Sequence, residues 1–496
     1  MRNFFVLTAA VLMLCAAPAG AQKLTVTFDR GSKEMRSDHS YVPGVASMAL
    51  DLTAAAKDRH PVVVRESGVD LSRRFSAAIW VKTPVGSLDR EVIFSVTGND
   101  GADKGFFAGS SGDGSWYVEI AGEKAAVTYN ATFDRQPLND GKWHLVGMSY
   151  DSDNSRADFF YDGLSVASYN TAEAGLPPLT TLFLGGRGAS EADSFNGYVD
   201  NFVLYDQLFS SDEMLALYMT FIRGVRASKQ PVAGDSIRFM TFDVAPGGAL
   251  TGNLVGPQRI AEVIEASGAD VVGLVNAGES GPVIADRLGF YLYRHSAVHS
   301  IVSRYPILNT YDLVDPAACA AVTVDAGKRR EIHYASLWLP QPLLGGISAL
   351  TAMPAAQIED MEAGRAGLLE KILHASRDLS GIEETIVVSG GFGSGSHLDW
   401  TVQYEDMHNG LTVRWPATVA MEGAGYRDSY RELYPSVRDF PGIPGNTNID
   451  GGKSYRKDFI FYKGGLEPVR AAAIGNHPVR FPSNSAAVMT TFKFGR

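Results

Sequence analysis

The chain has 496 residues and a mass of 53.3 kDa, a length typical of two or three domains rather than one compact core. Hydrophobic residues make up 45% and charged residues 20%, which excludes a disordered, collagen-like or coiled-coil protein. The 44 basic and 55 acidic residues give a formal net charge of -11, and such an acidic surface repels the phosphate backbone of nucleic acid. We therefore expect a folded protein with no nucleic-acid partner.

Residues 1–21 are predicted to be a cleaved signal peptide. An apolar run over residues 4–17 is followed by Ala19-Gly20-Ala21, the small residues that a signal peptidase requires. The alternative is lipidation at Cys15, but Leu14 before it is larger than the residue usual at that place. No later stretch reaches the ~18 apolar residues of a membrane helix. We therefore expect an exported chain without a transmembrane segment, in the periplasm, at the cell surface or in the medium.

Residues 22–222 are predicted to form an antiparallel β-sandwich. Short segments alternate apolar and polar residues and end at Gly, Asp or Asn turns. Examples are residues 75–81, 116–120, 143–150, 158–161 and 197–205. A helix is expected at residues 211–218, because Ser210 or Ser211 can cap it and acidic residues follow in its first turn.

The pattern changes after residues 223–235, which are polar and aperiodic and are predicted to be a linker. Beyond them, strands alternate with helices. Helices are expected at residues 257–267 and after Pro354, and strands at residues 237–242, 271–274, 385–388, 458–462, 467–474 and 486–494. This order predicts a layered α/β domain over residues 236–496.

Several motifs in residues 22–222 resemble the laminin-G-like, concanavalin A-like jelly-roll family. They are Asp140-Gly141-Lys142-Trp143-His144, Phe160-Tyr161-Asp162-Gly163, Leu184-Gly185-Gly186 and Phe195-Asn196-Gly197-Tyr198. The resemblance implies an all-β sandwich of two sheets that binds a glycan or an extracellular protein. It also implies a Ca²⁺ ion held by Asp29 and Asp200, since hard oxygen ligands suit that ion. The alternative is that each of these aspartates only caps a turn.

Three tryptophans in this region have two interpretations. Trp80, Trp116 and Trp143 could be platforms on which sugar rings stack, as lectin-like proteins use them. Each of them lies in a segment that alternates as a strand does, and one face of such a strand is buried. We therefore expect them to pack in the core.

Motifs in residues 236–496 resemble the endonuclease/exonuclease/phosphatase family, which has the DNase I-like fold. They include Phe239-Met240-Thr241-Phe242-Asp243, Ser303-Arg304-Tyr305-Pro306, Ser396-His397-Leu398-Asp399-Trp400, Asp428-Ser429-Tyr430-Arg431 and Asp458-Phe459-Ile460-Phe461. The resemblance implies a four-layered α/β sandwich with an active site at one end of two packed sheets. Its members hydrolyse phosphate esters with Mg²⁺: a Glu and an Asn hold the metal, an Asp activates water and two His stabilise the transferring group.

The positions that this resemblance makes functional hold other residues in this chain. They are Asp243 for an Asn, Ala277 for the metal-binding Glu, Leu337 for a His, Gly391 and Gly393 for an Asp and an Asn, and Asn484 and Ser485 for the final Asp and His. Losing one such group typically costs ~10²- to 10⁴-fold in rate. Asp428 and Asp458 do match the family pattern and are expected to line the cleft.

The sequence therefore favours an exported binding protein, in which a lectin-like module is joined to a phosphoesterase fold that has lost its catalytic residues. The alternative is an active Mg²⁺-dependent phosphoesterase with relocated ligands. The nearest substitutes are Glu279, His333 and His477, although their spacing from the family positions favours structural roles. In a third interpretation the second domain is purely structural.

Overall fold

The computed structural model describes residues 23–29, 38–65, 67–98, 103–222, 230–340, 353–379, 385–443 and 455–495. The predicted signal peptide lies outside them, as does most of the predicted linker. The chain divides into two compact units: most of the first precedes residue 229, and the second is Lys229–Arg496 together with Tyr129–Arg135 and Ala167–Glu173. None of the helices in the described ranges is both long enough and apolar enough to cross a membrane.

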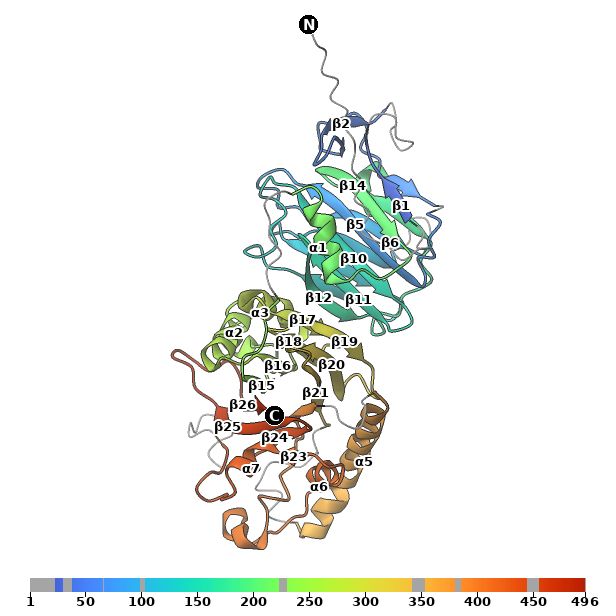
Figure 1. Ribbon diagram of the computed structural model, residues 1–496. Coiled ribbons are helices and arrows are strands. Elements are labelled where there is room, and N and C mark those ends of the chain that lie inside the picture. Colours follow the sequence, from blue (N-terminus) through green and yellow to red (C-terminus); the bar gives the residue numbers. More distant parts are fainter. Residues whose placement is uncertain are drawn as a thin grey trace. The chain divides into compact units, whose positions relative to one another are not determined.

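The first unit is a β-sandwich (Figure 1). Its strands are β1 (Lys23–Val26), β2 (Ser40–Pro43), β3 (Met48–Asp51), β4 (Val62–Val64), β5 (Arg74–Lys82), β6 (Glu91–Thr97), β7 (Gly105–Ser110), β8 (Trp116–Ala121), β9 (Ala126–Asn130), β10 (His144–Asp151), β11 (Arg156–Tyr161), β12 (Leu164–Asn170), β13 (Thr181–Leu184) and β14 (Tyr198–Tyr205). One sheet has the order β2-β3-β14-β5-β10-β11-β12, with β1 also on β14, and the other has the order β4-β13-β6-β7-β8-β9. The predicted all-β sandwich is confirmed.

Side chains that alternate along β5 are buried on both faces of the strand. Phe75 contacts Phe106 on the facing sheet, with ring centroids 6.4 Å apart. Trp80 is on the other face of β5 and stacks on Tyr218, with centroids 5.5 Å apart. Both faces of this strand are therefore buried, one against the second sheet and one beneath the helix that follows β14.

The helix α1 (Ser211–Met219) begins where the sequence predicts. Ser210 accepts a hydrogen bond from the backbone N–H of Glu213, and the Glu213 side chain accepts one from the backbone of Ser210. Such a reciprocal capping box satisfies two N–H groups that the helix leaves open. Figure 1 shows α1 lying over β5 and β10, and Met214 packs there against Trp80.

The second unit alternates strands and helices. Its strands are β15 (Ser236–Asp243), β16 (Val271–Val275), β17 (Tyr291–Arg294), β18 (His299–Ser303), β19 (Ile307–Tyr311), β20 (Cys319–Asp325), β21 (Glu331–Trp338), β22 (Ile386–Gly391), β23 (Arg427–Asp428), β24 (Asp458–Lys463), β25 (Leu466–Ile474) and β26 (Ala487–Phe494). Its α-helices are α2 (Val255–Ser267), α3 (Gly281–Leu288), α5 (Ala355–Leu379), α6 (Pro416–Gly423) and α7 (Ser429–Leu433).

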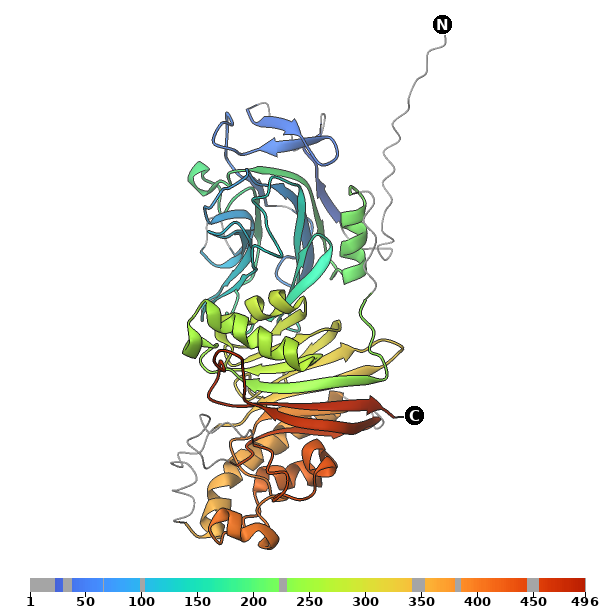
Figure 2. The same ribbon diagram turned by 90° about the vertical axis from the view of Figure 1, so that its left-hand side faces the viewer.

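These elements form four layers (Figure 2). One sheet has the order β17-β18-β16-β15-β26-β25 and the other β19-β20-β21-β22-β24-β23. Between them, Phe239 of β15 stacks on Tyr334 of β21, with ring centroids 5.4 Å apart. On the far side of the second sheet, Leu369 and Ile372 of α5 pack against Val388 of β22, and Figure 2 shows α2 and α3 outside the first sheet. The predicted four-layered α/β sandwich is confirmed.

Candidate functional site

In both sheets of the second unit, several strands have their carboxyl ends on the same side of the unit. Tyr334 packs on Phe239, and its hydroxyl donates to the carbonyl of Met240. Two residues further along β21, Ser336 lies against Gly273 of β16, which pairs with Thr241 of β15. The strands β15, β16 and β21 therefore run in the same direction, and β22 is parallel to β21.

This arrangement gathers several predicted site positions at the carboxyl ends of the strands. Asp243 ends β15 and Ala277 follows β16 by two residues. Gly391 ends β22 and pairs with Asp458, the first residue of the antiparallel β24. Leu337 is different, because its side chain is buried in the core between the second sheet and its helices. The side chain at the end of β21 is that of Trp338.

The carboxylate of Asp243 is held by neutral groups. Its Oδ1 accepts hydrogen bonds from the Asn276 side chain at 3.0 Å and from the backbone N–H of Ala245 at 3.1 Å. The Ser483 hydroxyl donates to the backbone carbonyl of Asp243 at 2.5 Å. The loop that carries Asn484 and Ser485 is thereby tied to the end of β15.

Gly391 lies where the family pattern has an aspartate, and little space remains beside it. A Cβ atom at this glycine would lie 3.2 Å from Oδ1 of Asp458 and 3.2 Å from Cδ1 of Trp338. The indole of Trp338 thus occupies space that a larger residue 391 would need. Gly393, two residues on, has φ +65°, a backbone conformation that non-glycine residues adopt at a cost.

The nearest substitutes for the missing ligands are engaged with other elements. Glu279 pairs with Arg294, with a nitrogen–oxygen distance of 3.0 Å. His333 is near the start of β21 and makes a 3.0 Å hydrogen bond to Thr323. His477 contacts Glu262 at 2.8 Å. Among the described residues, no three ligand atoms of His, Cys, Asp or Glu side chains converge in the second unit.

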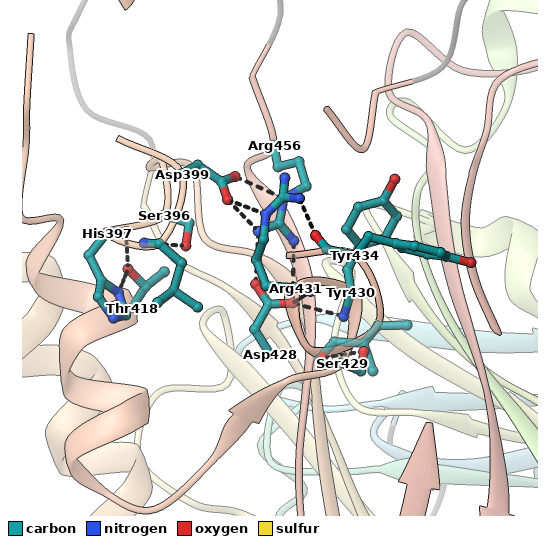
Figure 3. A network of polar contacts seen from close by, with 12 residues as sticks. Ser396, His397, Asp399, Thr418, Asp428, Ser429, Tyr430, Arg431, Tyr434 and Arg456 are labelled. Carbon is teal, nitrogen blue, oxygen red and sulfur yellow. Dashed lines mark hydrogen bonds and ion pairs between the residues drawn. The ribbon is translucent and has the colours of Figure 1, made fainter. Parts of the chain in front are cut away.

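Asp428, which the resemblance places in the cleft, has three structural partners (Figure 3). Its carboxylate accepts the backbone N–H groups of Tyr430 and Arg431, which caps the start of α7. It also pairs with Arg456 at 2.8 Å. Asp428 is only 5% exposed.

The same figure shows Asp399 between two arginines. Arg431 donates to it at 2.6 Å, and Arg456 donates to both of its oxygens, at 2.9 and 3.0 Å. Burial alone would raise the pKa of Asp399, but the charges and hydrogen bonds of Arg456 and Arg431 outweigh burial and hold that pKa below its ordinary value. We name these four residues, Asp399, Asp428, Arg431 and Arg456, the arginine–aspartate network.

Sequence reasoning did not identify this network, although three of its members lie in the quoted family motifs. Its pairs join Asp399 to Arg431 and to Arg456, residues that are far apart in the chain. Motif spacing gives no signal for such pairing. A groove of about 520 Å³ lies beside the network, lined in part by His397, Glu422 and Arg427. The groove runs along β23 and the middle of β24, and not at the carboxyl ends of β15, β16, β21 and β22.

The two aspartates predicted as calcium ligands lie close together in the first unit. Asp200 is fully buried, and its Oδ2 accepts the backbone N–H of Val45 at 2.9 Å. Its Oδ1 has no hydrogen-bond partner within the described residues. Burial raises the pKa of Asp200 to about 6, although backbone N–H groups beside the carboxylate lower it in part, and the charge of Asp29 adds to the rise.

This geometry fits a hard cation. A buried carboxylate oxygen without a donor is costly unless it is neutralised, and Ca²⁺ prefers oxygen ligands. Asp29 also accepts the backbone N–H of Met48 at 3.0 Å, which fixes that carboxylate. Asp200 and Asp29 would supply the charged oxygens, and the ion would remove their mutual repulsion.

Calcium is expected to stabilise the first unit through Asp200. At a concentration 100-fold above the dissociation constant, bound Ca²⁺ adds about 2.7 kcal/mol to the free energy of unfolding, which raises the melting temperature by several degrees. Asp200→Asn should abolish this rise. Asp153→Asn, at an exposed carboxylate of the same unit, should keep it, and the measurement is thermal unfolding with and without EDTA. An equal calcium response in both variants would mean that the ion binds elsewhere.

Comparisons with known proteins find similarities that each cover part of the chain. An uncharacterized protein of Caenorhabditis elegans is 28% identical over 275 residues, which are 51% of this chain and 87% of the relative. An endonuclease/exonuclease/phosphatase structure from Beutenbergia cavernae is 17% identical, with a TM-score of 0.37, and the match covers 53% of this chain and 72% of that one.

A second solved structure is similar to a smaller part of the chain. The CBM40 domain of a Ruminococcus gnavus sialidase is 16% identical, with a TM-score of 0.26, and the match covers 32% of this chain and 96% of that one. Residues 58–214 match the concanavalin A-like lectin/glucanases superfamily. This part of the first unit therefore has a concanavalin A-like, jelly-roll fold.

Proposed function

We propose that this protein is an exported, non-catalytic binding protein. Its lectin-like unit binds a glycan or an extracellular protein, and its phosphoesterase-like unit serves as a scaffold or recognition surface. The observation that carries the loss of catalysis is the arrangement at the end of β22, where Gly391 and Trp338 stand beside Asp458. Export rests on the signal-peptide pattern of residues 1–21.

The chemistry of phosphate-ester hydrolysis explains why this arrangement favours a non-catalytic role. A metal-assisted displacement needs carboxylate or amide ligands on the metal and a base within hydrogen-bond reach of the attacking water. Ala277 and Gly391 have no functional group, and Trp338 offers only an indole N–H donor. Asp243 and Asp458 alone would hold a metal weakly, and Asp243 is already bound by Asn276.

Hydrolysis of bis(p-nitrophenyl) phosphate with Mg²⁺ or Mn²⁺ tests the loss of catalysis. We expect the wild-type chain to give the same background rate as Asp458→Ala, because Ala277 and Gly391 supply neither a metal ligand nor a base. The control is Asp406→Ala, at an exposed carboxylate of the same unit. Metal-dependent turnover that disappears in Asp458→Ala and persists in Asp406→Ala would support the active phosphoesterase instead.

A glycan array with the full mature chain tests the binding role. The jelly-roll match at residues 58–214 supports a glycan as the first ligand class to examine. Selective binding to one glycan class is the expected outcome. Uniformly negative spots would turn the search to extracellular protein ligands.

A further inference from the structure

A cluster of metal-ligating side chains lies in the first unit, apart from the aspartates already described. Asp38 and His39 directly precede β2, and Asp58 lies in the loop between β3 and β4. One ligand atom from each of the three lies within 4.8 Å of the others. Nε2 of His39 is 3.3 Å from Oδ2 of Asp58.

The second observation is the imidazole of His39. Its side chain is fully buried, yet neither ring nitrogen has a hydrogen-bond partner within the described residues. The 3.3 Å approach to Asp58 lacks the geometry of a hydrogen bond. A buried polar group that stays unsatisfied costs about 1–3 kcal/mol, and a metal ion bound to Nε2 would remove that cost for this nitrogen. His39 is therefore directed at the carboxylates, and its 3.3 Å contact with Asp58 leaves both ring nitrogens without a hydrogen bond within the described residues.

Asp58 is already oriented for ligation. Its Oδ1 accepts the backbone N–H of His60 at 3.0 Å and contacts Nδ1 of His60 at 2.5 Å, so that Oδ2 is left facing His39. Partners that fix the second oxygen of a ligating carboxylate are common around metal ions and affect affinity. His60 is thus a positioning residue in this arrangement.

We propose that Asp38, His39 and Asp58 bind a divalent transition-metal ion, with Zn²⁺ as the best match. A mixed set of one imidazole and two carboxylates suits Zn²⁺, whereas Ca²⁺ and Mg²⁺ prefer oxygen ligands alone. Ligand atoms about 2.0–2.2 Å from a tetrahedral ion lie about 3.4 Å from one another. Binding therefore brings the three ligand atoms, which lie within 4.8 Å of one another, closer together, and water or a ligand oxygen takes the fourth position.

The ion would join the segment before β2 to the loop before β4. Because β2 pairs with β3, an ion that bridges these two segments would hold them together at this edge of the sheet. Zinc binding here depends neither on the glycan-binding role nor on the calcium pair. The zinc site includes the imidazole of His39, whereas Asp29 and Asp200 offer carboxylates alone, and each ion can therefore be tested separately.

Zinc titration of the EDTA-stripped full mature chain tests the proposal, with a chromophoric chelator as competitor and Co²⁺ absorption as the reporter of tetrahedral coordination. We expect stoichiometric zinc binding that excess Ca²⁺ does not displace. Asp38→Asn should weaken affinity at least about 10-fold and should fold normally, because Asp38 is exposed. His39→Asn should abolish both binding and the tetrahedral Co²⁺ spectrum.

The control is His477→Asn, which removes a histidine paired with a surface glutamate and should leave zinc affinity unchanged. If Asp38→Asn and His39→Asn, both shown by circular dichroism to be folded, bind zinc as tightly as the wild type, the site is refuted. Absence of stoichiometric binding to the wild type refutes it equally. If His39→Asn unfolds and Asp38→Asn folds, the zinc affinity of Asp38→Asn alone decides whether the site is retained or refuted.

Discussion

Replacing Asp399 by alanine is expected to lower the free energy of unfolding by about 3–5 kcal/mol, because breaking a buried ion pair leaves uncompensated charge in the interior. Arg431 and Arg456 both donate to this carboxylate, and both are about 5% exposed. Arg431 also donates to the carbonyls of Tyr434 and Phe440. Its misplacement would therefore loosen the chain after α7. Urea unfolding followed by tryptophan fluorescence measures the change.

The matched control is Asp406→Ala, which breaks a pair with Arg438 in which both side chains are more than half exposed. Exposed pairs contribute roughly 0–1 kcal/mol, so this variant should unfold almost as the wild type does. Equal effects of the two substitutions would show that the arginine–aspartate network does not stabilise the fold.

The contribution of Asp399 to the free energy of unfolding is expected to decrease as the pH falls. Its pKa in the folded protein is lowered from the ordinary value of 3.8, so that the unfolded chain binds the proton more readily. The stabilisation is therefore complete above the unfolded pKa and is lost as the pH falls through the lower folded pKa. Asp399→Ala should be less sensitive to acid over this range than the wild type.

Replacing Trp80 by alanine is expected to lower the free energy of unfolding of the first unit by about 3–5 kcal/mol, the usual cost of deleting a large buried aromatic side chain. Trp80 is fully buried. It stacks on Tyr218 and makes an edge contact with Phe221, so that α1 and the residues after it depend on it. Thermal unfolding of the full chain, with near-ultraviolet circular dichroism as the signal, measures the loss.

The same substitution distinguishes core packing from a sugar platform. A platform tryptophan would reduce ligand binding and leave stability within about 0.5 kcal/mol, as exposed substitutions usually do. Leu88→Ala, at a side chain that is 63% exposed in the same unit, provides the reference. A Trp80→Ala variant as stable as Leu88→Ala would contradict the packing described here.

Sequence pattern predicted the elements whose hydrophobic period is strong. The alternation in β5, the capping serine and first-turn acidic residues of α1 and the proline that precedes α5 all gave the correct type of element. Helix α3 was missed although Pro282 opens it and Gly289 ends it with φ +67°. It is only eight residues long, and too few apolar positions fall in it to show a period.

The candidate sites were less accessible from sequence because they depend on contacts between distant segments. Asp29 and Asp200 were paired only through a family resemblance, and the structure brings them close enough for their charges to interact. His39 and Asp58 share no motif, and no spacing rule would have joined them. Trp338 was not predicted at the strand ends, because the family pattern places the functional position at Leu337. The Leu337 side chain faces the helices instead.

In the proposed non-catalytic role, the strand ends of the second unit hold no catalytic metal. Mn²⁺ titration of the methyl-labelled full mature chain tests it most directly, because paramagnetic broadening reports where the ion binds. We predict that methyl signals of Leu337 and Leu339, close to the ends of β21 and β22, stay sharp at millimolar Mn²⁺, whatever happens in the first unit. Stoichiometric broadening of these signals that Mg²⁺ reverses would show a metal site at the strand ends and would favour a metal-dependent enzyme.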